Sequence, residues 1–481
     1  MLAILSVLSP FTHARAEFAD PVLNGVTPTL PELLVLAEEN HPAISAEKHR
    51  AQAQHHRAAA TQGFYDPQLE AGLLQTGGPL RSPDSFLPGY VEADSIAARG
   101  GVSLPLDPGV RLRASLTHWQ PYDSARRDGH ATVAGFSAEI PLLKDRGFET
   151  AKLTTHINEA LAHAADANRD TVIQNVRYNV SVAYVAYLRS LAAYQETLSA
   201  SNRADRIYSE TRERVKLTAN AAYELHTARM EIAFRTDDVL AADNAKDQAL
   251  IALLQAVRSA AIHFVGDDTP PSVEEFHRWA DLCRLNATNL NQFTISDSHR
   301  LRPEISAASF VTRARYSQKE FAENALKSDL SLRAGIGWRL HDSQWGYNSG
   351  DTFGWEAGIV WSRPFGLSAE RENIRSAEAE WYAAAAELNE ICGTTEMAMF
   401  RARAALESAL QRFELVQLAV DEAQKSLAAE EERFRLGEGR TRNVLDAQKD
   451  LTNANLRSHD VAAELLRAYF DLAHATGQLA P

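Results

Sequence analysis

Apolar residues recur every three or four positions from about residue 147 to 215, which is the spacing of an amphipathic helix. Residues 370–432 contain no proline and a single glycine, and they are rich in the strong helix formers Ala, Glu, Leu, Arg and Gln. Similar helical patterns run from about 223 to 265 and from 444 to 475. At about 1.5 Å per residue, the longest of these helices extends roughly 100 Å. The sequence therefore predicts two pairs of long helices.

Short turns separate the members of each pair. In the second pair, Gly437 and Gly439 predict a chain reversal, because glycine adopts a positive φ at low cost, and Thr441 or Asn443 can cap the returning helix. In the first pair, a turn around Thr218 stands in the same place. The pattern predicts two antiparallel helical hairpins, and this stretch alone is equally compatible with an ordinary helical bundle.

Two blocks of sequence, residues 66–141 and 329–365, change to short alternating segments between turns rich in Gly, Pro and Asp, which predicts strands. Most of the tryptophans lie in or beside these blocks, as in the aromatic girdles of membrane β-barrels; the core of a β-sandwich is the alternative. Lipid leaves no backbone amide unpaired, so such strands must close into a barrel. About four to six strands per chain are too few for a water-filled barrel. The sequence therefore predicts that several chains share one.

The order of elements occurs twice, which indicates an internal repeat. The segment 42–46, at a predicted helix start, is echoed by 303–307, and the turn at Thr218 is echoed by the turn at Gly437. The first strand block is longer and predicts an additional hairpin, roughly residues 97–119. The predicted domains are a first repeat over 17–265, a connector over 266–300 and a second repeat over 301–481.

Residues 1–16 form a short apolar run that ends in Ala14-Arg-Ala16, which predicts a signal peptide cleaved before Glu17. A chance apolar terminus is the alternative, because the basic n-region is missing. Elsewhere there is no uninterrupted apolar run of 18 residues, so no transmembrane helix is predicted. The 49 Lys and Arg against 63 Asp and Glu give a net charge of −14, and basic stripes are absent, which argues against a nucleic-acid partner.

Motifs that carry catalytic chemistry are absent from the sequence: there is no GxSxG, P-loop, HExxH or CxxC pattern. A glycan hydrolase with helical insertions would need paired carboxylates, which the sequence does not show. Cys283 and Cys392 are too few and too distant for a disulfide framework or a zinc site. His49, His55 and His56 have no Cys or carboxylate companions in the sequence, which favours an exposed helix face over a metal site. No enzyme, cofactor or metal is predicted.

Gly437 followed by Asn443-Val-Leu-Asp-Ala-Gln448 resembles the Gly-x(5)-Asp-Val-Leu-Asp-Ala pattern of the TolC-like outer membrane efflux proteins. With the repeat included, the resemblance covers nearly the whole chain. It implies a mainly α fold with a membrane β-barrel part, in which two repeats of long helical hairpins form a periplasmic tunnel and a few strands per protomer join a shared trimeric outer-membrane β-barrel.

The resemblance also implies a function. It is that of a homotrimeric exit duct for efflux or secretion, embedded in outer-membrane lipid and extended into the periplasm. Its partners are a periplasmic adaptor protein and an inner-membrane transporter. A soluble periplasmic coiled-coil scaffold or adaptor without channel activity is the alternative, although the strand blocks argue against it.

The resemblance further implies a narrow aperture at the hairpin tips. The gate tyrosine of the family falls on Phe434, its arginine falls on Gly439 beside Arg440, and its two aspartates fall on Asn443 and Asp446.

In the first repeat, a threonine and aspartate pair of the family falls on Tyr223 and Glu224. Only Glu224 and Asp446 keep the acidic chemistry, which predicts a ring of carboxylates at the entrance. The alternative is that both are first-turn carboxylates stabilised by the helix dipole.

Overall fold

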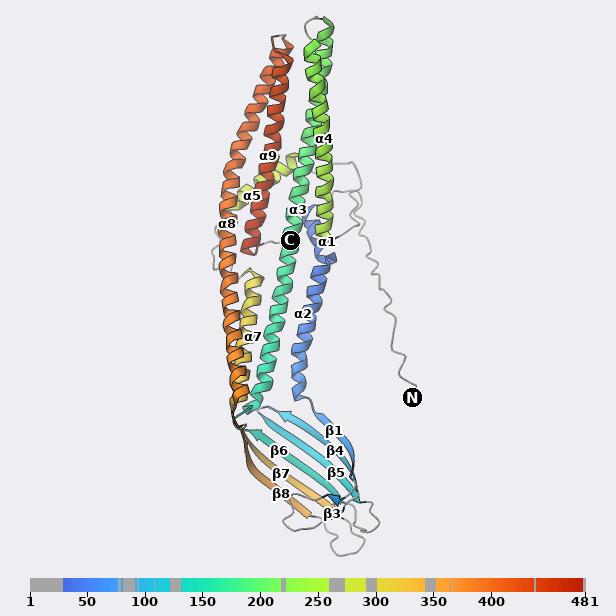
Figure 1. Ribbon diagram of the computed structural model, residues 1–481, viewed down its shortest axis with the longest axis vertical. Helices are drawn as coiled ribbons and strands as arrows, with labels where there is room; N and C mark the ends of the chain where they lie inside the picture. Colours follow the sequence, from blue (N-terminus) through green and yellow to red (C-terminus); the bar gives the residue numbers. More distant parts are fainter. Residues whose placement is uncertain are drawn as a thin grey trace, which may run out of the picture. The chain divides into compact units, whose positions relative to one another are not determined.

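The fold is mainly helical, with one principal antiparallel sheet (Figure 1). The structure is a computed structural model. It describes residues 29–76, 79–80, 91–92, 95–107, 109–121, 131–217, 222–258, 273–290, 301–341, 352–363, 365–436 and 438–478. The predicted signal peptide, 1–16, lies outside these residues. The chain divides into two compact units: the first comprises residues 1–45, 172–301 and 395–481, and the second comprises residues 46–171 and 302–394.

The structure contains the four long helices that the sequence predicts, together with four shorter ones in the described residues. They are α1 (Leu30–Asn40), α2 (Pro42–Ala60), α3 (Glu149–Leu217), α4 (Ala222–Val257), α5 (Val273–Leu290), α7 (Pro303–Leu326), α8 (Ser368–Arg435) and α9 (Thr441–Thr476). The helix α3 has 69 residues and α8 has 68, while α4 and α9 each have 36. None of the helices in the described ranges is long and apolar enough to cross a membrane.

The elements of the two halves follow one order: a helix, strands, a very long helix and a helix of 36 residues. This order is that of the predicted repeat, while the repeat bounds remain a prediction. One helix ends earlier than predicted, since α4 stops at Val257, before the predicted residue 265.

The core of the first unit is built from the apolar stripes of α1, α3, α4, α5, α8 and α9. Residues with no exposed surface include Leu33, Val180, Leu253, Met399 and Leu466. Burying a Leu or Met side chain stabilises the fold by about 1.5–3 kcal/mol, so this cluster holds the helices together.

The predicted connector, 266–300, contains a helix that the sequence analysis did not assign. Phe276, Ala280 and Cys283 of α5 are buried in the core cluster of the first unit, and the Trp279 ring lies 5.8 Å from the Phe470 ring of α9. Their three- and four-residue spacing was visible in the sequence. However, a single amphipathic helix of 18 residues gives a weak signal between two blocks of 68 residues or more.

The second unit contains the sheet, with strands in the order β1-β4-β5-β6-β7-β8. Its strands are β1 (Gln68–Thr76), β4 (Ser95–Leu106), β5 (Val110–Pro121), β6 (Ala131–Pro141), β7 (Asp329–His341) and β8 (Thr352–Ser362); β2 (Pro79–Leu80) and β3 (Val91–Glu92) form a separate small pair. All neighbouring strands are antiparallel. The additional hairpin predicted in the first block is β4–β5, and it lies inside the sheet (Figure 1).

The register gives the sheet two chemically different faces. One row of partners across all six strands is apolar: Leu69, Val102, Ala114, Phe136, Ile336 and Trp355. The adjacent row, which points to the other face because side chains alternate, is small or polar: Glu70, Gly101, Ser115, Gly135, Gly337 and Gly354.

The charged side chains of the central strands occupy the second face. Glu139 pairs with Arg333 at 2.9 Å, and Glu70 lies 3.9 Å from Arg113. We call the two sides the apolar face and the polar face of the sheet.

The turn of the additional hairpin packs closely on the start of α3. Gly109 has a φ of +112°, and a Cβ placed on it would lie 2.6 Å from the Cα of Gly147. Asp107, in the same turn, forms a 2.8 Å ion pair with Lys152 of α3. Only glycine fits this position, so the hairpin is held against the helix that follows the sheet.

Candidate functional site

The tip of the second hairpin is a tight turn between α8 and α9. The backbone N–H groups of Glu438 and Gly439 both donate to the carbonyl of Arg433, at 3.0 and 2.9 Å. A Cβ on Gly439 would lie 2.8 Å from the backbone nitrogen of Phe434. Gly439 is therefore required for space, and not for the positive φ that we predicted. Gly437 and Thr218, the other predicted turn residues, lie outside the described residues.

The returning helix α9 is not capped as predicted. Its N-cap is Arg440, whose side chain makes no capping hydrogen bond, and Thr441 is already the first helical residue. The Thr441 hydroxyl instead donates to a Glu224 carboxylate oxygen at 2.7 Å, although the two residues are 217 positions apart.

Thr441 joins the tips of the two hairpins. Its side chain is 1 % exposed, and its hydroxyl lies 3.5 Å from that of Thr211 on α3. Because Glu224 belongs to α4 and Thr441 to α9, this contact connects the first helical hairpin to the second. The sequence analysis assigned Thr441 only a capping role, since nothing in a local pattern identifies so distant a partner.

The predicted aperture residues do not share one environment. Tyr223 is 67 % exposed, and Arg440, Asn443 and Asp446 are exposed as well. Phe434, matched to the gate tyrosine, is instead 3 % exposed.

Phe434 belongs to a small apolar cluster with Leu427, Val444 and Leu451. Burial stabilises an apolar ring, so Phe434 helps to anchor the tip, and its place at an aperture stays a prediction. Asp446 faces solvent and lies 3.8 Å from Arg442, its neighbour one helical turn away.

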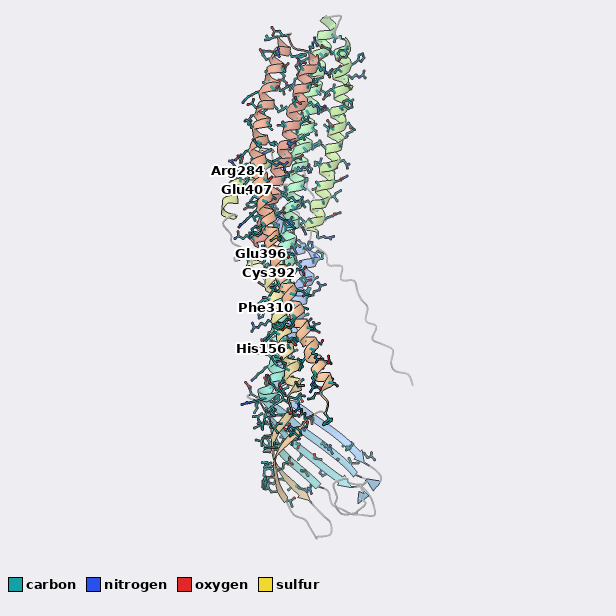
Figure 2. The ribbon with its side chains drawn as sticks, turned by 60° about the vertical axis from the view of Figure 1, so that its left-hand side comes forward. His156, Arg284, Phe310, Cys392, Glu396 and Glu407 are labelled. Carbon is teal, nitrogen blue, oxygen red and sulfur yellow. The ribbon has the colours of Figure 1, made fainter. Side chains whose placement is uncertain are left out.

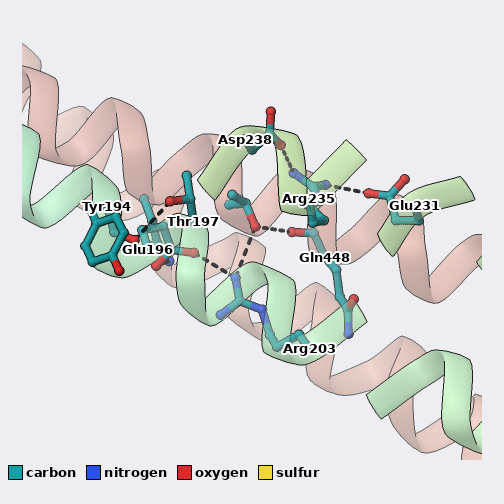
Figure 3. A network of polar contacts seen from close by, with 10 residues as sticks. Tyr194, Glu196, Thr197, Arg203, Glu231, Arg235, Asp238 and Gln448 are labelled. Atoms are coloured by element: carbon teal, nitrogen blue, oxygen red, sulfur yellow. Dashed lines mark hydrogen bonds and ion pairs between the residues drawn. The ribbon is translucent and has the colours of Figure 1, made fainter. Parts of the chain in front are cut away.

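Below the tip, polar contacts link α3 to α9 (Figure 3). Arg203 donates to Glu196 at 2.7 Å and to the Thr452 hydroxyl at 3.0 Å. Asn455 donates to the other Glu196 oxygen at 3.1 Å. On α4, Arg235 pairs with Glu231 and with Asp238. The contacts of Arg203 with Thr452 and of Asn455 with Glu196 join α3 to α9, whereas the Arg203–Glu196 pair lies within α3 and both Arg235 pairs lie within α4.

An open groove of about 860 Å³ runs along α3 and α8 beside the tip. Four arginines line it together with three glutamates: Arg203, Arg206, Arg212, Arg435, Glu210, Glu213 and Glu431. Its mixed charge suits a polar protein surface better than an apolar small molecule.

A second hollow of about 810 Å³ lies between α3, α5, α8 and α9 and contains two histidines. Nε2 of His277 lies 3.0 Å from Nδ1 of His459. Burial, and then the neighbouring His277, lower the pKa of His459 to about 4; burial also lowers the pKa of His277. Both rings are therefore neutral at pH 7.

The sequence predicts no metal site at the histidines of α2 and none at the two cysteines. His55 has a carboxylate partner that the sequence did not suggest, because its Nε2 lies 2.8 Å from Asp166 of α3. The described residues contain no group of three or more His, Cys, Asp or Glu side chains suited to a metal ion. Cys392 on α8 (Figure 2) and the buried Cys283 form no disulfide, and burial raises the pKa of the Cys283 thiol to about 12.

The sequence model of the outer membrane efflux protein family matches residues 294–478. The C-terminal part of the chain is therefore similar to this family. No curated protein matches the sequence.

Solved structures match over nearly the whole chain. The outer-membrane channel OprN aligns with a TM-score of 0.66 at 15% identity, covering 94% of this chain and 90% of its own. The MtrE outer membrane channel of Neisseria gonorrhoeae gives 0.64 at 16% identity, covering 94% and 89%. The outer membrane protein VceC of Vibrio cholerae gives 0.63 at 16% identity, covering 93% and 96%. The predicted fold class, a mainly helical chain with strands of the TolC-like type, is confirmed.

Proposed function

We propose that this protein is an outer-membrane exit duct for efflux, assembled as a homotrimer. The observation that carries the proposal is the two-faced sheet in a chain whose residues 294–478 match the outer membrane efflux protein family. An apolar face beside a polar face is what a barrel wall needs, with lipid on one side and water on the other.

The strand lengths support a membrane location. The strands of the six-stranded sheet other than β1 have 11–13 residues. At about 3.3 Å per residue and a tilt of about 40°, such strands span roughly 28–33 Å, which matches the hydrocarbon core of a bilayer. Trp338 and Phe353, near one end of the sheet on its apolar face, have ring centroids 5.2 Å apart, as suits an aromatic girdle.

The helical hairpins supply the second part of the duct, a periplasmic tunnel whose tips face the inner membrane. An adaptor protein and an inner-membrane transporter complete the path. The exposed charges of Arg435, Glu438 and Arg440, together with the groove of mixed charge along α3 and α8, offer the adaptor a polar docking surface.

The test of this function combines location with conduction. The protein is expected in the outer-membrane fraction, to be released only by detergent and to form discrete conducting units in planar bilayers. Recovery from the periplasm without detergent, with no conductance, would instead support the soluble scaffold.

The second part of the proposal concerns the entrance of the tunnel. Glu224 and Asp446 contribute carboxylates near the tips, so a trimer brings up to three copies of each to one constriction. Carboxylates attract cations and repel anions in a narrow pore. Glu224 has an additional role, because the hydrogen bond from Thr441 holds the two hairpins together near their tips.

Removal of these charges is expected to weaken cation selectivity. Asp446→Asn should lower the cation-to-anion permeability ratio and weaken block by a trivalent cation added at the tip side. Addition of Glu224→Gln should lower the ratio further and also raise the conductance, because an amide is a weaker acceptor for the Thr441 hydroxyl than a carboxylate.

Asp237→Asn provides the matched control, since this exposed aspartate lies on α4 about 20 Å from Glu224. Selectivity that is unchanged in the double variant would place both carboxylates away from the lumen and leave the exit duct itself standing.

A further inference from the structure

The principal sheet has six strands, which are too few to close into a water-filled barrel within one chain. Six strands pair in one continuous ladder from β1 to β8. The two outer strands, β1 and β8, each pair with a single strand of the sheet. Their outer edges present backbone N–H and C=O groups, and each such group left unsatisfied in lipid costs several kcal/mol.

We propose that β1 of one protomer pairs with β8 of the next, so that three chains of six strands close an 18-stranded barrel. The number of three protomers rests on the proposed function, whereas the six strands of each chain and the joining edges come from the sheet itself. The occupant of each edge is therefore a second copy of this chain.

Strand direction permits this closure. Successive strands of the ladder are antiparallel, so with six strands β1 and β8 run in opposite directions. When identical sheets join in a ring, β1 of one copy meets β8 of the next as an antiparallel pair. An odd number of strands would force parallel pairing at each junction, which membrane barrels built from up-and-down strands avoid.

Chemistry at the two edges is complementary as well. The apolar face continues to both outer strands, with Leu69 and Leu73 on β1 and Trp355, Ile359 and Trp361 on β8 all more than 60 % exposed in the single chain. Joining the edges makes one unbroken apolar belt around the barrel, and the polar faces meet inside.

The hairpin β4–β5 is an integral part of this wall. Each of its strands pairs along its length with both neighbours, and its turn is fixed against α3 by Gly109 and by the Asp107–Lys152 ion pair. At a strand spacing of about 4.8 Å and a tilt of about 40°, 18 strands give a backbone diameter on the order of 35 Å. Strand count and diameter scale together, so this exit is about 1.5 times as wide as a 12-stranded barrel of the same tilt.

Cysteine crosslinking in the full-length, detergent-extracted protein tests the proposal. Ala71→Cys on β1 is combined with Ala357→Cys or with Ile359→Cys on β8, all on the apolar face, and a mild oxidant is added. Directly opposed antiparallel residues have Cα atoms about 4.5–5.5 Å apart, within reach of a disulfide. We expect crosslinked species up to a limit of three times the 53.0 kDa chain mass.

Two comparisons make the outcome specific. Ala71→Cys with Ala114→Cys is the matched control, because β5 lies two strands in from the β1 edge and should give no crosslink. Ala71→Cys with Ala138→Cys tests the rival arrangement, in which the additional hairpin leaves the wall and β1 adjoins β6.

A crosslink within one chain between Ala71→Cys and Ala138→Cys would overturn the 18-stranded barrel while the trimeric duct stands. Crosslinked species that end at two or at four chains would also overturn the 18-stranded barrel, because the number of protomers would not be three. A protein that remains a single chain and does not conduct would remove the proposed function together with this inference.

Discussion

Acidification from pH 7 to pH 4 is expected to lower the free energy of unfolding by about 3 kcal/mol through His459 alone. The pKa of this histidine is about 4 in the folded protein, against an ordinary value of 6.5. Each unit of difference corresponds to about 1.4 kcal/mol. Below pH 6.5 the unfolded chain binds a proton that the folded protein excludes until about pH 4, so stability is present above this window and is lost as the pH falls through it.

The geometry around the pair explains why the folded protein excludes the proton. Nδ1 of His277 is buried with no hydrogen-bond partner among the described residues, while its Nε2 faces Nδ1 of His459. This arrangement suits a neutral His277 that donates from Nε2, because an unprotonated nitrogen without a partner costs less than a buried N–H without one. Protonation of His459 would place an N–H where it must accept.

Unfolding by urea at pH 7 and pH 4 measures the effect. His459→Gln retains an acceptor for His277 and cannot be charged, so much of the pH dependence should disappear. The exposed His56, changed to Gln, is the control. Equal pH dependence in the wild-type protein and in His459→Gln would contradict the assignment.

Ile359→Arg is expected to destabilise the membrane part by about 2–4 kcal/mol per chain, because an arginine would lie on the lipid side of the barrel, two residues from the middle of β8. Ile359 is 68 % exposed on the apolar face of β8 and pairs with Leu332. In a trimer the cost occurs three times, so we expect loss of the assembled, heat-resistant oligomer.

The adjacent residue provides the matched control. Val360 is also β-branched and aliphatic, but it lies on the polar face opposite Ser331. Val360→Arg should assemble nearly as well as the wild-type protein, since its charge would enter the water-filled lumen. The measurement is the urea midpoint of the oligomer for both variants. Equal losses would mean that the two faces are not lipid and water.

The effect of either arginine also depends on the closing strand, since β8 is an outer strand of the single sheet. If β1 of the next protomer covers its edge, Ile359→Arg should affect assembly more than stability within one chain. A lower yield of trimer at an unchanged total amount of folded chain would therefore agree with the proposed junction.

The sequence alone determined the long helices and the two strand blocks, although it left the shorter helix α5 unassigned. Long stretches free of proline and rich in helix formers can satisfy their backbone only as helices, and α8 extends over Ser368–Arg435, close to the predicted 370–432. Alternation of apolar and small or polar residues likewise predicted the strand block 329–365, which contains β7 and β8. The additional hairpin followed from the same pattern, because these periods are local and need no knowledge of the partners.

Only the tertiary structure decided which residues meet. Thr441 and Glu224 are separated by 217 positions, and His277 and His459 by 182. Phe434, matched to a gate residue by its place in the sequence, is buried in a small cluster at the tip. Period and composition indicate which face of a helix is buried, but not which element packs against it. Many faces have similar polarity, and the fit of the side chains in the folded protein decides which of them pack together. The function of each tip residue depends on that choice.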